Sequence, residues 1–150
     1  MNLDQVLEAL RSACLSGDVE RRMAPVDECF VTLPSACLRR AVEALLEIGV
    51  WHLSTITGQD VDDRVELLYH FWEGQGLTLC TSVPREDARI PTLTDLIPGA
   101  SFYEREIGEM LHVTVEGHPD PQPLFLPDDW NGEAPLRREF TLPPGEEESA

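Results

Sequence analysis

Five residues in the second half of the chain carry side chains that could bind a metal ion or transfer protons. They are three carboxylates and two imidazoles: Glu104, Glu106, Glu109, His112 and His118. Carboxylate and imidazole groups are common ligands of divalent metals and common general acids and bases. A site built from them would make the chain a free-standing, metal-dependent enzyme.

The spacing of these residues argues against such an enzyme. On a helix, Glu104 and Glu106 point in different directions, because residues two apart do not share a face. Glu109 and His112 lie three apart and do share a face, but catalytic zinc normally has three protein ligands. No serine or cysteine has recognisable histidine and acidic partners, and no glycine-rich phosphate loop is present. We therefore predict no catalytic, cofactor-binding or metal-binding residue in this chain.

A second interpretation of the same region is a surface that contacts another protein. Arginine and large aromatic side chains are enriched where proteins bind one another. The residues that we predict to contact a partner are Glu104, Arg105, Glu106, His118, Trp130, Arg137, Arg138 and Phe140. Two alternatives stay open: Trp130 and Phe140 could pack on the chain's own sheet, and Arg105 could bridge carboxylates within this chain.

Composition limits the kinds of partner that such a surface could bind. The chain has 150 residues, 42% of them apolar, which is enough for one folded domain. Its formal net charge is −17, and all eleven basic residues are arginine. Nucleic acids and anionic lipids require a basic surface, so we expect neither to bind. A basic surface on a partner protein would suit so acidic a chain.

Nothing in the sequence directs the chain into or across a membrane. No run of about 18 apolar residues is present, and the first residues lack the basic and apolar regions of a secretion signal. Cysteines stand at positions 14, 29, 37 and 80, without the close spacing of a zinc site or a disulfide framework. We therefore predict a cytoplasmic protein with reduced, mostly buried thiols.

Hydrophobic periodicity predicts a sheet with helices in the first part of the chain. Asn2 can cap an amphipathic helix that ends at Gly17-Asp18. Alternation predicts a strand over 28–33, and Ser35 can cap a second helix that Gly49 ends. Further strands are expected at 51–57, 64–72 and 77–83. A polar turn at 58–63 separates the first two, and a hairpin loop at 74–76 separates the last two. In the strand 64–72, alternation places four apolar residues on one face: Val65, Leu67, Tyr69 and Phe71. The predicted fold class is α+β: a mainly antiparallel sheet of about four strands with helices packed on one face.

The remaining residues predict a helix and then an extended arm. Residues 84–91 form a charged connection, and Ser101 to Glu104 have the pattern of a capping box that begins a helix. From Pro119 onward the prolines are too closely spaced for regular structure, and the acidic residues 146–148 are expected to be frayed. The chain thus divides into a sheet domain (1–89), a connecting helical segment (90–115) and an extended, proline-rich docking arm (116–150), which together form one structural unit.

Four motifs in this part of the chain resemble the signature of a known family. They are Ile90–Ala100 (IPTLTDLIPGA), Glu104-Arg105-Glu106, Gly117-His118-Pro119 and Pro135–Phe140 (PLRREF). Their order and spacing over residues 64–142 resemble the C subunit of NADH-quinone oxidoreductase, the respiratory complex I. Related subunits occur in membrane-bound, energy-converting hydrogenases. The N-terminal third agrees with the family only in its expected pattern of elements.

The resemblance implies a subunit that has no cofactor of its own. Electrons would pass through iron–sulfur clusters in adjacent subunits, and the quinone or nickel–iron site would lie in a large partner subunit. The arm would run across that large subunit and stabilise the assembly. The chain would be peripheral to the cytoplasmic face of the membrane, without direct insertion.

Three departures from the family's pattern indicate a divergent partner surface. Gly108, Glu109 and His112 stand where the family usually has an aromatic or polar residue, an Asp and a Gly. Pro121-Gln122-Pro123 replaces a usual Leu-Arg-Arg, and Arg138-Glu139 replaces Lys-Asp. These changes shift the expectation toward a hydrogenase-type or otherwise specialised complex. A complex I-type subunit, its hydrogenase equivalent and, less expected, the metal-dependent enzyme all stay open.

Overall fold

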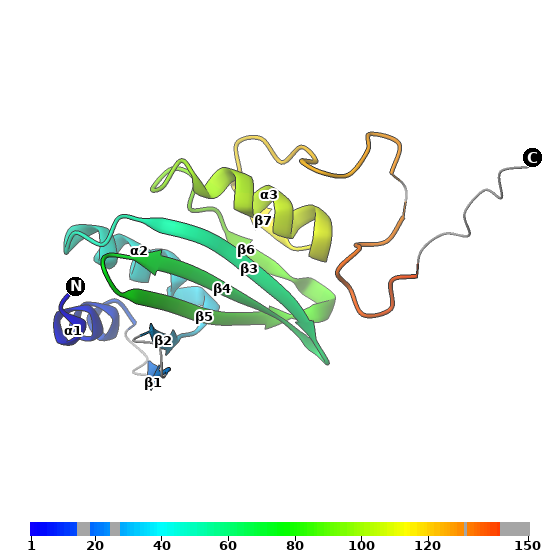
Figure 1. The fold of residues 1–150 in the computed structure, drawn as a ribbon. Helices are drawn as coiled ribbons and strands as arrows, with labels where there is room; N and C mark the ends of the chain where they lie inside the picture. The colour runs from blue at the N-terminus through cyan, green and yellow to red at the C-terminus, as the bar shows by residue number, and fades with distance from the viewer. Residues whose placement is uncertain (15–18, 25–27, 131, 142–150) are drawn as a thin grey trace, which may run out of the picture.

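A mixed sheet of five strands forms the body of the protein, and a second sheet of two short strands lies beside it. The structure is a computed structural model that describes residues 1–14, 19–24, 28–130 and 132–141. The strands are β1 (Glu20–Met23), β2 (Glu28–Thr32), β3 (Leu53–Val61), β4 (Arg64–Trp72), β5 (Gly76–Pro84), β6 (Arg89–Pro91) and β7 (Thr114–Glu116). The helices are α1 (Leu3–Ala13), α2 (Leu38–Glu47) and α3 (Ala100–Leu111), with single 3-10 turns η1 (Ser35–Cys37) and η2 (Arg85–Asp87) (Figure 1).

The large sheet has the strand order β1-β2-β5-β4-β3. All neighbouring strands are antiparallel except β2 and β5, which are parallel. The parallel pair results from the way that the chain connects β2 to β3. Helix α2 carries the chain to the far edge of the sheet, where β3 runs parallel to β2. Two hairpins then reverse the chain twice before β5. The predicted α+β fold with a mainly antiparallel sheet is confirmed, with five strands in place of about four.

The start of α1 follows directly from the sequence. The Asn2 side chain accepts hydrogen bonds from the N–H groups of Asp4 at 3.1 Å and Gln5 at 3.3 Å, so the predicted cap is confirmed. The helix ends at Ala13, and the predicted end at Gly17-Asp18 lies outside the described residues.

The end of α2 also follows from the sequence, but its start does not. Gly49 has a φ of +86° and its N–H donates to the Leu46 carbonyl at 3.1 Å, as expected of a glycine that ends a helix. The predicted cap at Ser35 is wrong, because the chain first makes the turn η1 and Ser35 lies inside it. Cys37 then precedes α2 without a capping side chain.

The β3–β4 hairpin is longer than predicted. Strand β4 has the expected bounds, but β3 continues to Val61, so the predicted turn over 58–63 is wrong. Gly58 and Asp60 pair with β4 residues, and only Asp62 and Asp63 separate the two strands. Polar residues are tolerated here because β3 is an edge strand of the large sheet.

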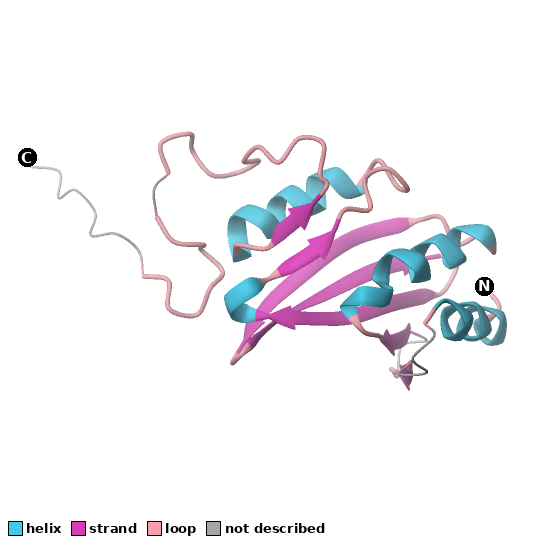
Figure 2. Ribbon diagram, turned by 180° about the vertical axis from the view of Figure 1, so that it is seen from behind, coloured by secondary structure: helices cyan, strands magenta, loops and turns pink. Residues whose placement is uncertain are grey.

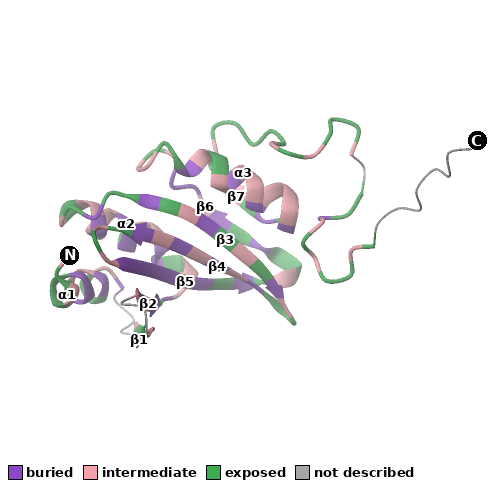
Figure 3. Cartoon of the chain, in the orientation of Figure 1, coloured by how far each residue is buried: buried purple, intermediate pink, exposed green. Residues whose placement is uncertain are grey.

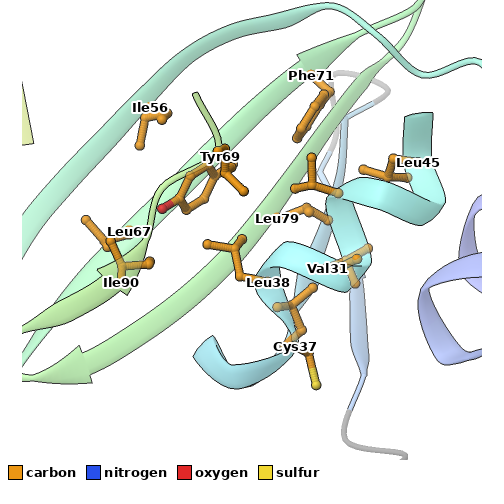
Figure 4. Close-up of a cluster of buried hydrophobic side chains, with 14 of the residues drawn as sticks. Val31, Cys37, Leu38, Leu45, Ile56, Leu67, Tyr69, Phe71, Leu79 and Ile90 are labelled. Atoms are coloured by element: carbon orange, nitrogen blue, oxygen red, sulfur yellow. The ribbon is translucent and has the colours of Figure 1, made fainter. Parts of the chain in front are cut away.

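The hydrophobic core lies on the face of the sheet that α2 and β6 cover. The inward residues of β4 are each at most 2% exposed: Val65, Leu67, Tyr69 and Phe71. Figure 4 shows Tyr69 and Leu67 near Ile90 of β6, with Leu38 and Leu45 of α2 beside Leu79. Seen from behind, α2 and the short strands β6 and β7 stand in front of this face of the sheet (Figure 2). Buried residues alternate with more exposed ones along β4, as expected of a strand covered on one face (Figure 3).

Helix α3 packs along the β3 edge and connects the two parallel strands β6 and β7. The Tyr103 hydroxyl donates to the carbonyl of Ser54 in β3 at 2.7 Å. A Cβ atom on Gly58 would lie 2.5 Å from Leu111 Cδ1, so the close approach of helix and strand requires glycine. The predicted capping box is wrong: Gly99 precedes α3, and Ser101 lies within its first turn. The strand β6 is not predicted by the sequence, because three residues ending in proline carry no readable alternation.

The arm follows β7 and contains no helix or strand over the described residues 117–130 and 132–141. This agrees with the proline spacing. Figure 1 shows the arm in yellow to orange, passing beyond the end of α3 and returning toward the sheet. The predicted frayed end at 146–148 lies outside the described residues.

Candidate functional site

Glu104 lies on the buried face of α3. Its side chain is 1% exposed and accepts hydrogen bonds from Thr92 Oγ1 at 2.6 Å, Leu93 N at 2.5 Å and Thr94 Oγ1 at 2.8 Å. Three donors satisfy an ionised carboxylate and offset the cost of burying its charge. Burial raises the pKa of the nearby Tyr69 hydroxyl well above its usual range, with the Glu104 charge as a second cause. Glu104 thus ties α3 to the segment after β6.

His118 is buried where the arm leaves β7. Its Nδ1 accepts the Asp120 N–H at 3.0 Å, which leaves the proton on Nε2 in the neutral ring. Nε2 faces the Ser101 hydroxyl at 3.2 Å and carbonyl at 3.3 Å, and lies 3.8 Å from the Glu104 carboxylate. Gly117 has a φ of +80°, which permits the turn. His118 therefore fixes the first turn of the arm against the start of α3.

Two charged residues one turn apart on α3 hold the arm by its backbone, and we call these contacts the α3 clamp. The Arg105 guanidinium donates to the carbonyl oxygens of residues 122 and 123 at 2.7 and 2.8 Å. The Glu109 carboxylate accepts the N–H groups of residues 124–126 at 3.0, 2.8 and 3.2 Å. Because the clamp binds backbone atoms, it fixes the course of the arm and leaves Phe125 64% exposed.

A second set of contacts fixes the far end of the arm, and we call it the Asp60 latch. The Asp60 side chain in β3 is 1% exposed and accepts two hydrogen bonds from Arg85 at 2.8 and 2.9 Å. The Arg138 N–H donates to it at 3.1 Å, and the Arg137 guanidinium lies 3.4 Å away. Arg85 also donates to Glu139. The Arg85 guanidinium is the main reason that the pKa of Asp60 is lowered to about 2.

The residues around the latch also close the C-terminal end of α3. The last carbonyls of a helix lack partners within the helix. Here the Leu136 N–H donates to the Met110 carbonyl at 2.9 Å, and Arg137 Nε donates to the Leu111 carbonyl at 2.7 Å. The positive charge of Arg137 also suits the negative end of the helix dipole. The Arg137 side chain is only 10% exposed, because it makes these contacts within the chain. Its contact with a partner stays a prediction.

Between the clamp and the latch, the arm forms a loop that presents aromatic and acidic side chains. The rings of Trp130 and Phe140 pack on each other with centroids 6.0 Å apart and a tilt of 38°. Asp128 and Asp129 are exposed beside Trp130. Leu136 is 56% exposed. The loop is thus anchored at both ends and leaves apolar surface available.

The other predicted residues lie apart from one another. Arg138 donates to Asp62 at 2.8 Å at the surface, and Glu106 is half-buried on α3. Glu109 is occupied by the arm, and His112 follows α3 in the left-handed conformation. In the part of the chain that the structure describes, no three His, Cys, Asp or Glu residues gather as a metal site would require.

Sequence reasoning misses the two residues that organise the latch, Asp60 and Arg85. It places Asp60 in a turn and Arg85 in a charged connection. A signal is present: the acidic run at 60–63 and the arginine pair Arg137-Arg138 have complementary charges. Charge complementarity between segments far apart in sequence does not by itself say which residues meet.

Comparison with known proteins identifies the family. The model of the family described as "Respiratory-chain NADH dehydrogenase, 30 Kd subunit" matches residues 31–146, which include the end of β2, all of β3 to β7 and most of the arm. The chain belongs to this family. The motifs at Glu104, His118 and 135–140 that resemble the family's signature therefore correspond to the buried carboxylate, the turn and the latch described above.

Individual relatives in the family are respiratory subunits with different electron donors in their names. The C subunit of NADH-quinone oxidoreductase from Moorella thermoacetica is 29% identical over 128 residues, covering 83% of this chain and 82% of the relative. The C subunit of F(420)H(2) dehydrogenase from Methanosarcina mazei is 35% identical over 94 residues, covering 59% of this chain and 60% of the relative.

A solved structure agrees with the fold. The trypsin-resistant fragment of Nqo5 superimposes with a TM-score of 0.69 at 28% identity, covering 80% of this chain and 99% of the fragment. Among the helices of the described residues, none has both the length and the apolar character needed to cross a bilayer.

Proposed function

We propose that the chain is a non-catalytic subunit that docks onto the large quinone-site subunit of a complex I-type NADH-quinone oxidoreductase and stabilises that assembly. The observation that carries the proposal is the anchored arm. The α3 clamp and the Asp60 latch order its backbone, while Phe125 and Leu136 remain 64% and 56% exposed. Binding through an ordered backbone costs less conformational entropy than binding through a free tail.

Charge supports a protein partner with a basic surface. The net charge of −17 would repel nucleic acid and anionic lipid, and the exposed Asp128 and Asp129 stand beside the Trp130–Phe140 pair. An apolar contact rimmed by acidic residues is complementary to an apolar patch rimmed by arginine or lysine. Iron–sulfur clusters and quinone would then lie in partner subunits, with this chain peripheral on the cytoplasmic face of the membrane.

The proposal is tested by purifying the tagged full-length chain from its native cells in mild detergent. We expect a large subunit and iron–sulfur subunits to co-purify. Phe125→Ser combined with Leu136→Ser should lower their yield at least about tenfold, because the loss of two central apolar contacts costs more than about 1.4 kcal/mol. Met23→Ser is the matched control, since Met23 is also exposed but lies on β1. A chain that purifies alone and turns over a substrate would contradict the proposal.

A second candidate is the equivalent subunit of another energy-converting complex, such as a membrane-bound hydrogenase. The similarity to a subunit of F(420)H(2) dehydrogenase and the uncharged segment Pro121-Gln122-Pro123 favour it. The identity of the large subunit that co-purifies decides between the two. Nickel bound by a cysteine pair would identify a hydrogenase, whereas a nickel-free complex that reduces quinone would identify the first candidate.

A further inference from the structure

Three large apolar side chains are exposed at the end of the sheet where β3 begins. Trp51 lies before β3 and is 64% exposed, Trp72 ends β4 and is 53% exposed, and Phe102 on the first turn of α3 is 59% exposed. The neighbouring Tyr103 bonds that turn of α3 to Ser54 near the start of β3. We call these three side chains the aromatic end. The other large exposed apolar residues of the described chain lie on β1 and the arm: Met23, Phe125 and Leu136.

The backbone that carries the two tryptophans is held in place. The Trp72 N–H donates to the His52 carbonyl at 3.0 Å. The Glu73 carboxylate accepts the N–H groups of Trp51 at 3.1 Å and His52 at 3.2 Å. The two segments are therefore cross-linked by three hydrogen bonds, and both indoles project from an ordered scaffold. Solvent-exposed tryptophan on rigid backbone is typical of sites where proteins bind one another.

The two stretches that supply the tryptophans carry more acidic than basic side chains, although the N-terminal ammonium of Met1 also lies 3.4 Å from the Glu73 carbonyl. No arginine lies between residues 41 and 63 or between 65 and 84, the two stretches that supply the tryptophans. Glu47 is exposed and Glu73 is partly exposed in the same stretches. An arginine guanidinium is attracted both to these carboxylates and to the faces of the indole rings. Anionic lipid would be repelled by the same charges.

The two tryptophans are separate from the far part of the arm, which carries Leu136; the arm itself begins near Phe102, where His118 contacts Ser101. In Figure 1 the start of β3 lies beside α1, whereas the orange part of the arm lies beyond the opposite end of the sheet. One short segment of a partner cannot cover both places, so the contact of the arm with its partner does not account for the exposed tryptophans.

We infer that the aromatic end is a second docking surface, which binds an arginine-bearing segment of a partner protein with guanidinium groups against Trp51 and Trp72. The chain would then contact its assembly at both ends of the sheet. This surface does not depend on the arm, so the two can be tested separately.

Site-specific photo-cross-linking tests the inference in the intact assembly. The photoreactive residue p-benzoylphenylalanine replaces Trp72 in the tagged full-length chain, which is expressed in its native cells and irradiated before purification. The same residue at Phe125 reports on the arm. At Thr57, which is exposed on β3 but polar, it serves as the control. Cross-linked peptides are identified by mass spectrometry.

We expect a protein adduct at position 72 whose cross-linked segment contains arginine. Trp51→Ala should lower its yield at least about tenfold, which corresponds to a loss of about 1.4 kcal/mol from the neighbouring aromatic contact. Trp51→Ala should leave the melting temperature of the isolated chain unchanged, because the ring is exposed.

Three results would overturn the inference: adducts only with lipid, adducts only with segments lacking arginine, or a yield at position 72 no higher than at Thr57. An adduct from position 72 without one from position 125 would support the aromatic end and contradict the proposed role of the arm.

Discussion

Two buried carboxylates, Asp60 and Glu104, join segments that lie far apart in the sequence. Asp60 binds residues of η2 and of the arm, and Glu104 binds the segment after β6. A buried charge is tolerated only where donors surround it, and removal of a partner leaves an uncompensated group. Each carboxylate therefore depends on its hydrogen-bond donors, and substitution of either one is expected to lower the free energy of unfolding.

Asp60→Asn is expected to lower the free energy of unfolding by about 3 kcal/mol, because two arginines in the latch lose their charged acceptor. Urea denaturation of the full-length chain measures this. Asp62→Asn is the control, since Asp62 pairs with Arg138 at the surface and its side chain is 77% exposed. Equal losses from the two variants would show that the latch is not a buried charge cluster.

Glu104→Gln is expected to destabilise the chain by about 2 kcal/mol. The amide group of glutamine supplies one acceptor in place of two, so donors from Thr92, Leu93 or Thr94 are left without a partner. The control is Glu106→Gln on the same helix, which should change the melting temperature little. A Glu104→Gln protein as stable as the unmodified chain would contradict a role for the hydrogen bonds to both Glu104 carboxylate oxygens.

At the scale of elements, hydrophobic periodicity predicts the helices and strands whose type depends only on the residues of their own segment. Helix α1 begins at the predicted cap and strand β4 has the predicted bounds, because both follow from residues of their own segment. The pairing of β2 with β5 and of β6 with β7 joins segments that lie far apart in the sequence, and local spacing carries no information on either pairing. Periodicity also fails on the buried face of α3, because Glu104 occupies an apolar position on it.

Glu109→Ala is expected to release the arm from α3. Three consecutive amides lose their acceptor, so hydrogen exchange of residues 124–126 should accelerate at least about tenfold. Amide exchange followed by mass spectrometry or NMR measures this. The Leu136 amide, which donates to Met110, should exchange at an unchanged rate, because the latch holds that part of the arm. Unchanged exchange at 124–126 would show that the clamp does not order the arm.

Gly58→Ala is expected to destabilise the packing of α3 on β3 by about 1–3 kcal/mol, because the new methyl group would lie 2.5 Å from Leu111 Cδ1. Leu111 is 1% exposed, so its side chain has little room to move. Leu111→Ala in the same chain should recover part of the loss. A double-mutant cycle measured by thermal unfolding would then show coupling between the two positions, and strictly additive losses would contradict the close approach.

At the scale of the whole molecule, the sequence motifs predict the family and the arm but not the structural reason for each residue. The order of the motifs predicts the family, and proline spacing predicts an arm without regular structure. Sequence reasoning assigns Arg105 and Arg137 to a partner, yet both also bind backbone atoms of this chain. A sequence cannot separate these roles, because an arginine that orders an arm and one that binds a partner have the same chemistry.

The latch also gives the molecule a specific response to acid. The pKa of Asp60 is about 2 in the folded chain, below the ordinary 3.8, so its contribution to stability is present above about pH 4 and is lost as the pH falls toward 2. The contribution is about 2 kcal/mol. Denaturant midpoints measured between pH 2 and 6 should therefore fall more steeply for the unmodified chain than for Asp60→Asn. Parallel curves would contradict this assignment.

The latch draws on β3, on the turn after β5 and on the final turn of α3, all of which precede it in synthesis. Its last pieces, residues 137–139, emerge from the ribosome after every one of these parts. We therefore expect the loop between the clamp and the latch to become ordered only after the preceding parts of the chain have folded. A copy in which one of these parts is missing or misfolded would lack the ordered loop, and the docking that we propose would be lost with it.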